Sequence, residues 1–522
     1  MGLDPAGSRW LFSSLHVPMK KPSLLIIFLT VFIDLIGFGI VMPLLPRYSE
    51  RFGAEGFWIG AVISSFSLMQ FFFSPWWGAL SDRIGRRPVL LISNAGSAVS
   101  YVLFAMASSL QGSTGLMVLL ASRVFAGICG ANISVASAYI ADITTPENRS
   151  RGMGMIGMAF GLGFILGPAI GSVAAWWGLA GPGWVAAALC ALNFILGSFI
   201  LVESRVPGVS APPRRPKFAQ WSHTFSQPAL ALLILLFFLA TFCFTCFETT
   251  LPLLLGSSKI HEHNLRNPAV LATAIGQAKD PIAQHLKSSL AVHNLTLPSE
   301  GSDRGAWVSV LNQLIQQPDF YNATAFSAQA LPPALQQRLE KVNENGGAAR
   351  TALNRDLLQF AYPEALSAPR FFFDEKRIGF IFAYCGIVAA FIQGGAIGRL
   401  VKRFGEVRLI WLSLAAVAIS LVLIPISSGL GALLFGLGVF AAGSGINRAP
   451  TMGLISASSS SEEQGANLGV AQSAGAVARI VGPIFATTLY AHAVTLPYFL
   501  CAGIALAASL IAWMRLRVAV PR

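Results

Sequence analysis

The stretch GALSDRIGRR at residues 78–87 returns in altered form as GRLVKRFGE at residues 398–406. A second stretch, GFILGPAIG at residues 163–171, is echoed by RIVGP at residues 479–483. Each of these stretches lies within or directly after a long apolar segment, so the two parts of the chain carry similar motifs in the same order. Parallel repeats of this kind build transporters whose substrate site lies between the repeats near the bilayer midplane.

Twelve apolar segments surround these motifs, and each approaches the roughly 20 residues that a helix needs to cross a bilayer. Six precede and six follow a linker rich in proline and arginine, which is typical of an exposed connector. We therefore predict an all-α membrane protein with twelve transmembrane helices in two pseudo-symmetric six-helix bundles. The predicted helices are Leu24–Leu45, Phe57–Leu80, Pro88–Ser109, Leu116–Ile140, Gly152–Trp176, Gly183–Val202, Ala229–Leu255, Ile378–Leu400, Leu409–Ile426, Gly429–Gly453, Leu468–His492 and Tyr498–Leu516.

A long outer loop separates the seventh and eighth predicted helices. Its apolar residues recur at helical spacing, which predicts amphipathic helices containing Trp307, Val310, Leu311, Leu314 and Ile315, and then Leu331, Leu335, Leu339 and Val342. A small helical cap and a disordered insertion both fit this pattern. The predicted order is a cytoplasmic tail (1–23), the first bundle (24–202), a cytoplasmic linker (203–228), helix seven (229–255), the extracytoplasmic insertion (256–376), helices eight to twelve (377–516) and a cytoplasmic tail (517–522).

The composition separates this chain from soluble proteins. Hydrophobic residues make up 54% of its 522 residues and charged residues 11%, whereas soluble domains carry roughly 25% charged residues. The net charge of +13 is no sign of a nucleic-acid partner, because the basic residues lie between apolar segments rather than on one face. The sequence contains no nucleophile–base set, metal-ligand cluster or phosphate loop, so we expect no enzyme and no resident metal or cofactor.

The basic residues also predict the orientation in the bilayer. The short loops on the side away from the N-terminus hold only Arg47 and Arg51, whereas the other side is rich in lysine and arginine. Because short cytoplasmic loops carry the excess of positive charge, both termini are expected in the cytoplasm. We expect a multi-pass monomer in a bacterial inner membrane, with the lipid bilayer as its surroundings.

Five ionisable residues fall within the apolar segments: Asp34, Arg123, Glu248, Arg448 and Arg479. Such residues cost roughly 2.5–3.5 kcal/mol on insertion scales and usually mark a functional site. Asp34 and Glu248 lie on the helices that begin the two repeats, so both carboxylates could face a common cavity. We interpret Asp34 as the main proton carrier with Arg123 as its partner, and Glu248 as a second proton or cation site. Structural ion pairs are the alternative.

Arg448 lies within the tenth predicted helix and could contact an anionic or zwitterionic substrate, or neutralise one of the two carboxylates. Arg479 is interpreted as a packing and pairing residue. The candidates for lining a substrate cavity are Phe38, Gln70, Phe160, Glu248, Gln393, Asn447 and Arg448.

Several motifs together resemble the major facilitator superfamily, and specifically its twelve-span drug/proton antiporter branch, which includes tetracycline exporters. They are DLIGFGIVMPLLP at 34–46, DRIGRRP at 82–88, RVFAGICG at 123–130, ADITTPENR at 141–149 and GFILGPAIG at 163–171. The resemblance implies a cytoplasmic gate motif comprising Gly78, Asp82, Arg83, Gly85, Arg86, Arg87 and Asp142. It also implies an antiporter motif comprising Gly163, Gly167, Pro168 and Gly171.

These motifs also have a physical interpretation. Asp82 and the neighbouring arginines can form a charge cluster that ties the two halves together at the cytoplasmic side, and the resemblance implies that it breaks when the carrier opens inward. Gly163, Gly167 and Gly171 recur every fourth residue, which leaves a smooth face for another helix. Pro168 would disturb the helix that carries them.

Three positions depart from the tetracycline exporters. The acidic residue and tyrosine of their third helix are matched by Ser100 and Tyr101, the histidine of their eighth helix by Ala389, and the aspartate of their ninth helix by Val417. We therefore do not expect tetracycline to be the substrate.

The function expected from the sequence is a secondary transporter. The leading interpretation is an antiporter that exports small amphipathic organic molecules in exchange for protons, with the proton gradient as its energy source and no cofactor. A proton symporter or facilitator for a metabolite is one alternative. A transporter-like receptor that acts through the outer loop is another.

Overall fold

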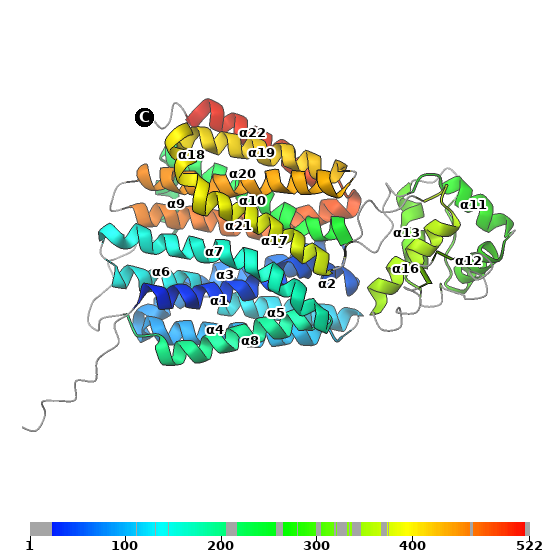
Figure 1. Ribbon diagram of the computed structural model, residues 1–522, viewed down its shortest axis with the longest axis horizontal. Coiled ribbons are helices and arrows are strands. Elements are labelled where there is room, and N and C mark those ends of the chain that lie inside the picture. The colour runs from blue at the N-terminus through cyan, green and yellow to red at the C-terminus, as the bar shows by residue number, and fades with distance from the viewer. Residues whose placement is uncertain are drawn as a thin grey trace, which may run out of the picture.

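The computed structural model describes residues 23–110, 112–130, 132–144, 146–204, 217–256, 265–278, 280–298, 304–317, 320, 331–332, 335–336, 346–366, 373, 375–427, 429–459 and 463–516. Within them, twelve helices are long and apolar enough to cross a membrane. They run alongside one another as one elongated bundle, and a group of shorter helices lies beyond one of its ends (Figure 1). The predicted fold class is therefore confirmed.

The first six spans form the first half of the bundle. They are α1 (Leu24–Val41) continued by η1 (Met42–Leu44) and α2 (Leu45–Arg51), α3 (Phe57–Ile84), α4 (Arg86–Ala107), α5 (Gly112–Cys129) with α6 (Asn132–Ile143), α7 (Pro146–Ala174) with η2 (Ala175–Trp177), and α8 (Gly181–Ile200).

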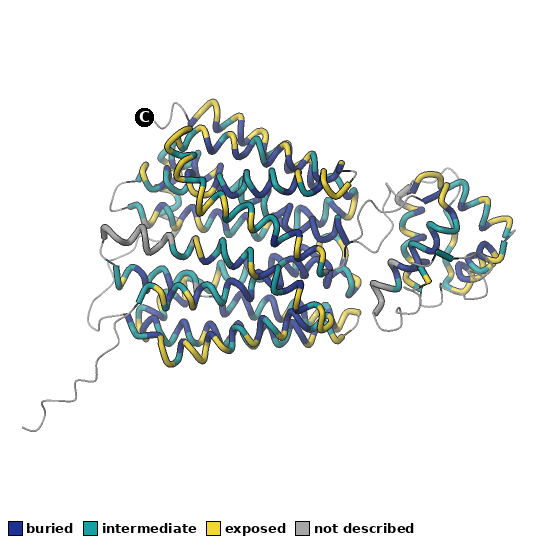
Figure 2. The backbone as a smooth tube through the Cα atoms, in the orientation of Figure 1, coloured by how far each residue is buried: buried dark blue, intermediate teal, exposed yellow. Residues whose placement is uncertain are grey.

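The last six spans form the second half. They are α10 (Pro228–Gly256), α17 (Glu375–Phe391) continued through a π-helical turn, η5 (Ile392–Ala396), into α18 (Ile397–Phe404), α19 (Glu406–Ile426), α20 (Leu430–Ala457), α21 (Gln464–His492), and α22 (Leu496–Ile511) with a final π-helical turn, η6 (Ala512–Leu516). Large apolar side chains on the outer helices remain exposed, and exposed positions recur along the sides of the bundle (Figure 2). This is the surface expected for helices in contact with lipid tails.

The fourth span differs from its prediction because it is interrupted at Gly130, between α5 and α6. The Gln70 side chain on α3 donates a hydrogen bond of 3.0 Å to the Gly130 carbonyl oxygen. A side-chain donor thus satisfies a backbone acceptor at the break, which an interruption at membrane depth requires.

The glycines of α7 form the face on which α1 packs. A side-chain carbon at Gly167 would lie 2.6 Å from the Cα atom of Gly39, one at Gly163 would lie 2.8 Å from Cβ of Leu35, and one at Gly171 would lie 3.0 Å from a carbonyl oxygen of α1. No side chain larger than hydrogen fits at these points without moving a helix. The close approach of α1 and α7 therefore depends on the glycine repeat.

The linker between the halves is not simply an exposed connector. Its second part forms α9 (Lys217–Phe225), and the buried Thr224 hydroxyl donates a hydrogen bond of 2.7 Å to the Asn467 side-chain oxygen on α21. Asn467 is itself buried and donates to the Ser459 hydroxyl at 3.0 Å. This polar anchor fixes α9 to the second half, which proline and arginine content alone did not predict.

The insertion between α10 and α17 folds as a small helical unit, here called the cap. Its described helices are α11 (Pro268–Gln277), α12 (Pro281–Val292), α13 (Arg304–Ile315) and α16 (Gly346–Ala361). They bury Trp307 and Leu311 of α13 against Leu286 of α12 and Leu357 of α16. The helix predicted around Trp307 is present, whereas Leu339 and Val342 lie outside the described residues. A helical cap is therefore the better of the two interpretations.

The two halves touch at one end of the bundle, the cap end, where α10 ends and α17 begins. A side-chain carbon at Gly60 of α3 would lie 2.5 Å from Cα of Ile484 on α21, and the Ser64 hydroxyl donates to the Ile480 carbonyl oxygen at 2.6 Å. On the other side of the bundle, a side-chain carbon at Gly379 of α17 would lie 2.8 Å from the Pro168 carbonyl oxygen. The halves are therefore packed backbone to backbone at the cap end.

The halves separate at the opposite end, the terminal end, where α1 begins and η6 finishes. Gly78 follows Gly60 by 18 residues, which is five turns at 3.6 residues a turn, so both glycines lie on the same face of α3. A side-chain carbon at Gly78 would meet no described atom within 4 Å, and the same holds for Gly394 and Gly398. The face that touches the second half at the cap end is thus open at the terminal end.

Candidate functional site between the two halves

The central space between the halves is lined by side chains from both. Arg448 on α20 of the second half is exposed, and its guanidinium carbon lies 5.4 Å from the ring centre of Phe160 on α7 of the first half. The Gln393 side-chain oxygen in η5 lies 3.8 Å from where a side chain at Gly161 would begin. Arg448 and Phe160 therefore meet across the two halves, where a cation lies over an aromatic face, and Gln393 lies beside Gly161, the next residue of α7.

A row of aromatic rings leads from this point into the first half. The ring of Phe160 stacks 6.4 Å from that of Phe164, which lies 5.9 Å from Phe38 on α1. The Phe38 ring in turn lies 5.2 Å from Phe66 on α3. The predicted cavity residues Phe38 and Phe160 thus belong to one apolar wall of the first half.

The charges of the second half form a group of one acid and two bases. Glu248 on α10 is buried, and Arg479 on α21 is the charged residue that acts on it most directly. Arg479 is also an electrostatic neighbour of Arg448. Arg479, which we expected to serve in packing and pairing, therefore links the buried acid to the exposed Arg448. The group contains two guanidinium groups and one carboxylate, so it carries a net positive charge when all three are ionised.

The charges of the first half lie deeper within that half. Asp34 is half-buried on α1, and the Cys190 thiol on α8 lies 4.0 Å from its Oδ1 atom. Tyr101 on α4 is an electrostatic neighbour of Asp34 and of Arg123. The Arg123 guanidinium carbon lies 5.4 Å from the Tyr101 ring centre, and the side chain is buried. Tyr101 thus lies between the two residues that the sequence pairs directly.

Tyr101 and Cys190 are the residues that sequence reasoning missed. The sequence does point to Tyr101, because this residue occupies a position where the tetracycline exporters carry a tyrosine beside an acidic residue. Nothing in the sequence points to Cys190, because a cysteine in an apolar helix is usually a small packing residue.

Two predicted cavity residues lie elsewhere. Asn447 is buried, and its side-chain nitrogen donates a hydrogen bond of 2.9 Å to the Ser413 hydroxyl on α19. It precedes Arg448 by one residue, and neighbouring residues on a helix face directions about 100° apart. Gln70 is engaged at the break beside Gly130. Both side chains hold helices in position rather than line the central space.

The gate motif forms a charge network within the first half. Arg86 pairs with Asp82 at 2.6 Å and with Asp142 at 3.1 Å. The Glu203 carboxylate accepts hydrogen bonds from the backbone N–H groups of Arg86 and Arg87 at 2.8 and 3.1 Å, and so caps α4. These contacts of the predicted cluster join elements of one half, as expected when the terminal end is open.

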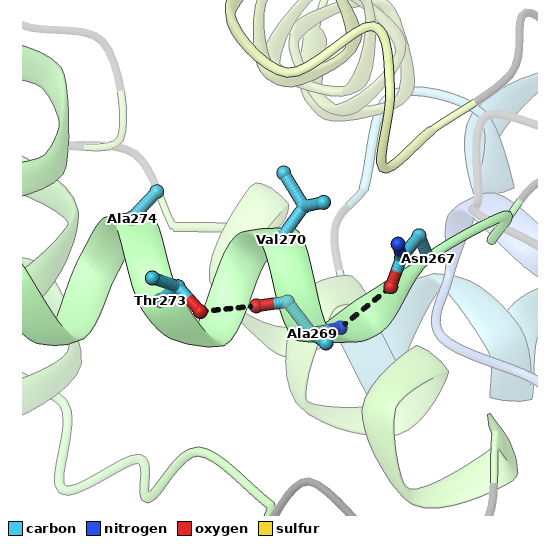
Figure 3. Close-up of a pocket in the computed structure, with 5 residues that line it drawn as sticks. All are labelled: Asn267, Ala269, Val270, Thr273 and Ala274. Atoms are coloured by element: carbon cyan, nitrogen blue, oxygen red, sulfur yellow. Dashed lines mark hydrogen bonds between the residues drawn. The ribbon is translucent and has the colours of Figure 1, made fainter.

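The cap offers no comparable site among its described residues. A shallow hollow lies beside α11, lined by Asn267, Ala269, Val270, Thr273 and Ala274 (Figure 3). The Asn267 side-chain oxygen accepts from the Ala269 N–H, and the Thr273 hydroxyl donates to the Ala269 carbonyl oxygen. Both polar side chains thus bond to their own helix, which leaves the central space as the candidate site.

Twelve spans in two repeated halves, with an arginine of one half over an aromatic ring of the other, define a polytopic membrane transporter. A model of the Major Facilitator Superfamily matches residues 27–278 and 326–522. The chain belongs to this superfamily, and its relatives put it in the tetracycline-exporter-like branch.

The class C tetracycline resistance protein of Escherichia coli is 41% identical over 193 residues, which are 36% of this chain and 46% of that protein. Major facilitator superfamily domain-containing protein 10 of Mus musculus is 32% identical over 286 residues, covering 45% of this chain and 60% of that protein. The matched region thus spans about half the length of these relatives.

Two solved structures share the fold. The human organic anion transporter MFSD10 (TETRAN) is 23% identical, with a TM-score of 0.54, over 94% of this chain and 98% of that chain. The nucleoside transporter NupG is 12% identical, with a TM-score of 0.58 and the same coverage. The protein is therefore an integral multi-pass membrane transporter, and the comparisons point away from an enzyme.

Proposed function

We propose that the protein is an antiporter that exports small amphipathic organic molecules in exchange for protons, by alternating access. The observation that carries this proposal is the separation of the intramembrane charges. Asp34 lies inside the first half with Tyr101 and Arg123, whereas Glu248, Arg479 and Arg448 belong to the second half around the central space. Because the two sites are separate, a proton and a substrate can each shift the same conformational equilibrium without competing for one binding position.

Asp34 is the proposed proton carrier. Its neighbours come from α4 and α8, so a change in its charge alters the packing of helices within the first half. A proton that binds more tightly in one state than in the other shifts the balance between the states by the difference in affinity. Arg123 acts on Asp34 through Tyr101, and Glu248 is the second candidate for protonation.

The substrate is proposed to carry an anionic group on an apolar body. Arg448 presents its guanidinium to the central space over the Phe160 ring, and Arg479 adds a second positive charge. A relative with the same fold is described as an organic anion transporter. Charge from Arg448 and apolar surface from the phenylalanine row would then bind the two parts of one molecule, while Gln393 offers hydrogen bonds.

The terminal end is proposed to face the cytoplasm of a bacterial inner membrane, because the basic residues concentrate there. The protein acts as a monomer, uses the proton gradient and needs no cofactor. In this orientation the state described above is open to the inside. The gate motif and the antiporter motif then act at the cytoplasmic closure and along the α1–α7 contact.

Proteoliposomes loaded with a pH-sensitive dye test the proposal. Anionic, neutral and cationic amphiphiles are added in turn, and substrate-evoked proton movement is expected for the anionic compounds. Asp34→Asn should abolish this movement, whereas Glu55→Gln, which changes an exposed carboxylate in the loop before α3, should preserve it. Substrate flux in the wild type without proton movement would overturn antiport in favour of a facilitator, and protons moving with the substrate would indicate a symporter.

The same vesicles test the substrate site. Arg448→Gln should weaken the response to anions by about tenfold or more, because a hydrogen bond to a charged group contributes roughly 1.5–3 kcal/mol. Arg408→Gln, at an exposed arginine near the start of α19, is the matched control and should leave the response unchanged. Equal responses in the two variants would remove Arg448 from the site.

A further inference from the structure

Glu248 on α10 is an acid buried within the second half. The residue is 7% exposed, and Arg479 on α21 is the charged residue that acts on it most directly. Among the described residues, no side chain donates a hydrogen bond to its carboxylate. The nearby hydroxyls of Thr249 and Thr250 donate instead to carbonyl oxygens of their own helix, each at 2.8 Å. The Glu248 charge therefore acts on its surroundings over a distance rather than through a direct contact.

The positive charges of the group belong to two arginines with different access to the central space. Arg448 is exposed, and its guanidinium carbon lies 5.4 Å from the ring centre of Phe160 on the first half. Arg479 is half-buried and is the electrostatic neighbour of both Glu248 and Arg448. A ligand in the central space can therefore touch Arg448, while Arg479 and Glu248 act on that ligand through their charges.

These three charges sum to one positive charge when all are ionised. An anion with a single charge that binds at Arg448 thus leaves the group neutral. An anion with two charges leaves one negative charge in excess inside the membrane, where uncompensated charge is costly. Because charges interact strongly at a low effective dielectric, the Glu248 carboxylate repels a second anionic charge across several ångströms.

We propose that Glu248 is a specificity residue, which restricts the central site to organic anions with a single negative charge. Its burial leaves direct contact with the ligand to Arg448 and to the row of phenylalanine rings. The carboxylate offsets one of the two positive charges, so that the site matches a monoanion rather than a dianion. The inference rests on the proposed anionic substrate and adds the number of charges that this substrate carries.

Two naphthalene sulfonates test the charge of the site without a proton gradient. Naphthalene monosulfonate and naphthalene disulfonate share one apolar body and keep their charges over a wide pH range, and methyl naphthyl sulfone is their neutral counterpart. Binding of each compound to the purified protein in detergent is measured by isothermal titration calorimetry, in a mildly alkaline buffer that favours the charged carboxylate. The wild type should bind the monosulfonate most tightly.

Glu248→Gln removes one negative charge and nearly keeps the shape of the side chain. Electrostatic energy scales with the charge of the ligand, so the gain in binding free energy should be about twice as large for the disulfonate as for the monosulfonate. We expect the preference to shift toward the disulfonate by about tenfold or more, because a charge several ångströms away acts at an effective dielectric of about 20. Binding of the neutral sulfone should be unchanged.

Two further variants separate the effect of charge from that of structure. Glu248→Gln together with Arg479→Gln restores a single net positive charge, carried by Arg448, and should return the preference close to that of the wild type. A change in shape or packing would not be reversed by removing an arginine. Glu364→Gln, at an exposed carboxylate in the cap, is the matched control and should keep the wild-type preference.

A gain in Glu248→Gln that is equal for both sulfonates and the neutral sulfone would overturn the inference, because Glu248 would then act through shape. An unchanged preference would also overturn it, while sulfonate binding to the wild type would still support an anionic substrate. Failure of the wild type to bind either sulfonate would overturn the anionic substrate itself, and this inference with it. These measurements use no gradient, so they are distinct from the test of proton antiport.

Discussion

Replacement of Gly167 by alanine tests the contact between α1 and α7. The new methyl carbon would lie 2.6 Å from the Cα atom of Gly39, which is well inside the distance at which carbon atoms touch. Both groups belong to helix backbones, so no side chain can rotate to relieve the overlap. The two helices must move apart, and the apolar contacts beside Gly39 loosen with them.

The size of the effect follows from two opposing terms. Overpacking a well-packed contact costs about 1–3 kcal/mol. Alanine is favoured over glycine within a helix by roughly 0.5–1 kcal/mol. Gly503→Ala supplies the matched control, because Gly503 is an exposed residue in the middle of α22 and a methyl group there meets no described atom within 4 Å. Both variants gain the same stability from replacing glycine by alanine within a helix. The difference between their free energies of unfolding therefore measures the cost of overpacking, about 1–3 kcal/mol.

The assay is the unfolding midpoint in one detergent, followed by tryptophan fluorescence for both variants and the wild type. Gly167→Ala should unfold earlier than Gly503→Ala. A graded series sharpens the test, since the shortest contacts lengthen from 2.6 Å at Gly167 to 2.8 Å at Gly163 and 3.0 Å at Gly171. The loss should decrease in that order. Equal midpoints for Gly167→Ala and Gly503→Ala would refute the argument that the glycine repeat permits this packing.

Two further predictions concern the parts outside the spans. Thr224→Val should cost about 0.5–1.5 kcal/mol, because the buried Asn467 oxygen loses the Thr224 hydroxyl as a donor and keeps only the Gln220 side-chain nitrogen at 3.3 Å. Hydrogen exchange in α9 should rise, while Ser222→Ala at an exposed position should leave it unchanged. Protected α9 amides in Thr224→Val would show that the anchor is not needed. Leu311→Ala should destabilise the cap by about 2–5 kcal/mol through loss of a fully buried side chain, so that limited proteolysis cuts the cap while the melting of the spans is unchanged. Resistance equal to that of the wild type would contradict a packed cap core.

The spans could be predicted from the sequence because length and apolar content suffice to identify a membrane helix. Which side of each helix faces the central space could not be predicted with the same certainty. A helix that is apolar all round has no polar face to give its orientation, so Asn447 and Arg448 were assigned to the same cavity. The structure turns Asn447 toward Ser413 and leaves Arg448 exposed over Phe160.

Long-range polar contacts were equally out of reach. The Thr224–Asn467 bond joins residues that are far apart in the chain, and neither residue belongs to a motif. Tyr101 lay at a position that the resemblance had singled out, yet its place between Asp34 and Arg123 depends on how α4 packs against α1 and α5. The charged residues within the spans stand out in the sequence because placing a charge in the membrane costs free energy. Their interaction partners can be identified only from the fold.

The chain leaves the second half at Gly256 for the cap and returns to it at Glu375. The backbone N–H of Phe373 donates to the Leu255 carbonyl oxygen at 2.8 Å, and Arg266 donates in the same way to Ala365 at the base of the cap, also at 2.8 Å. The first of these bonds joins the two ends of the insertion beside α10, and the second closes the base of the cap itself. Both chain connections of the cap, after Gly256 and before Glu375, thus lead to the second half. The cap is therefore covalently connected to the second half at both ends and to the first half at neither, so its position outside the bundle is tied to that of the second half. A fluorophore or an antibody fragment bound to the cap would therefore follow the movement of the second half relative to the first from outside the bilayer.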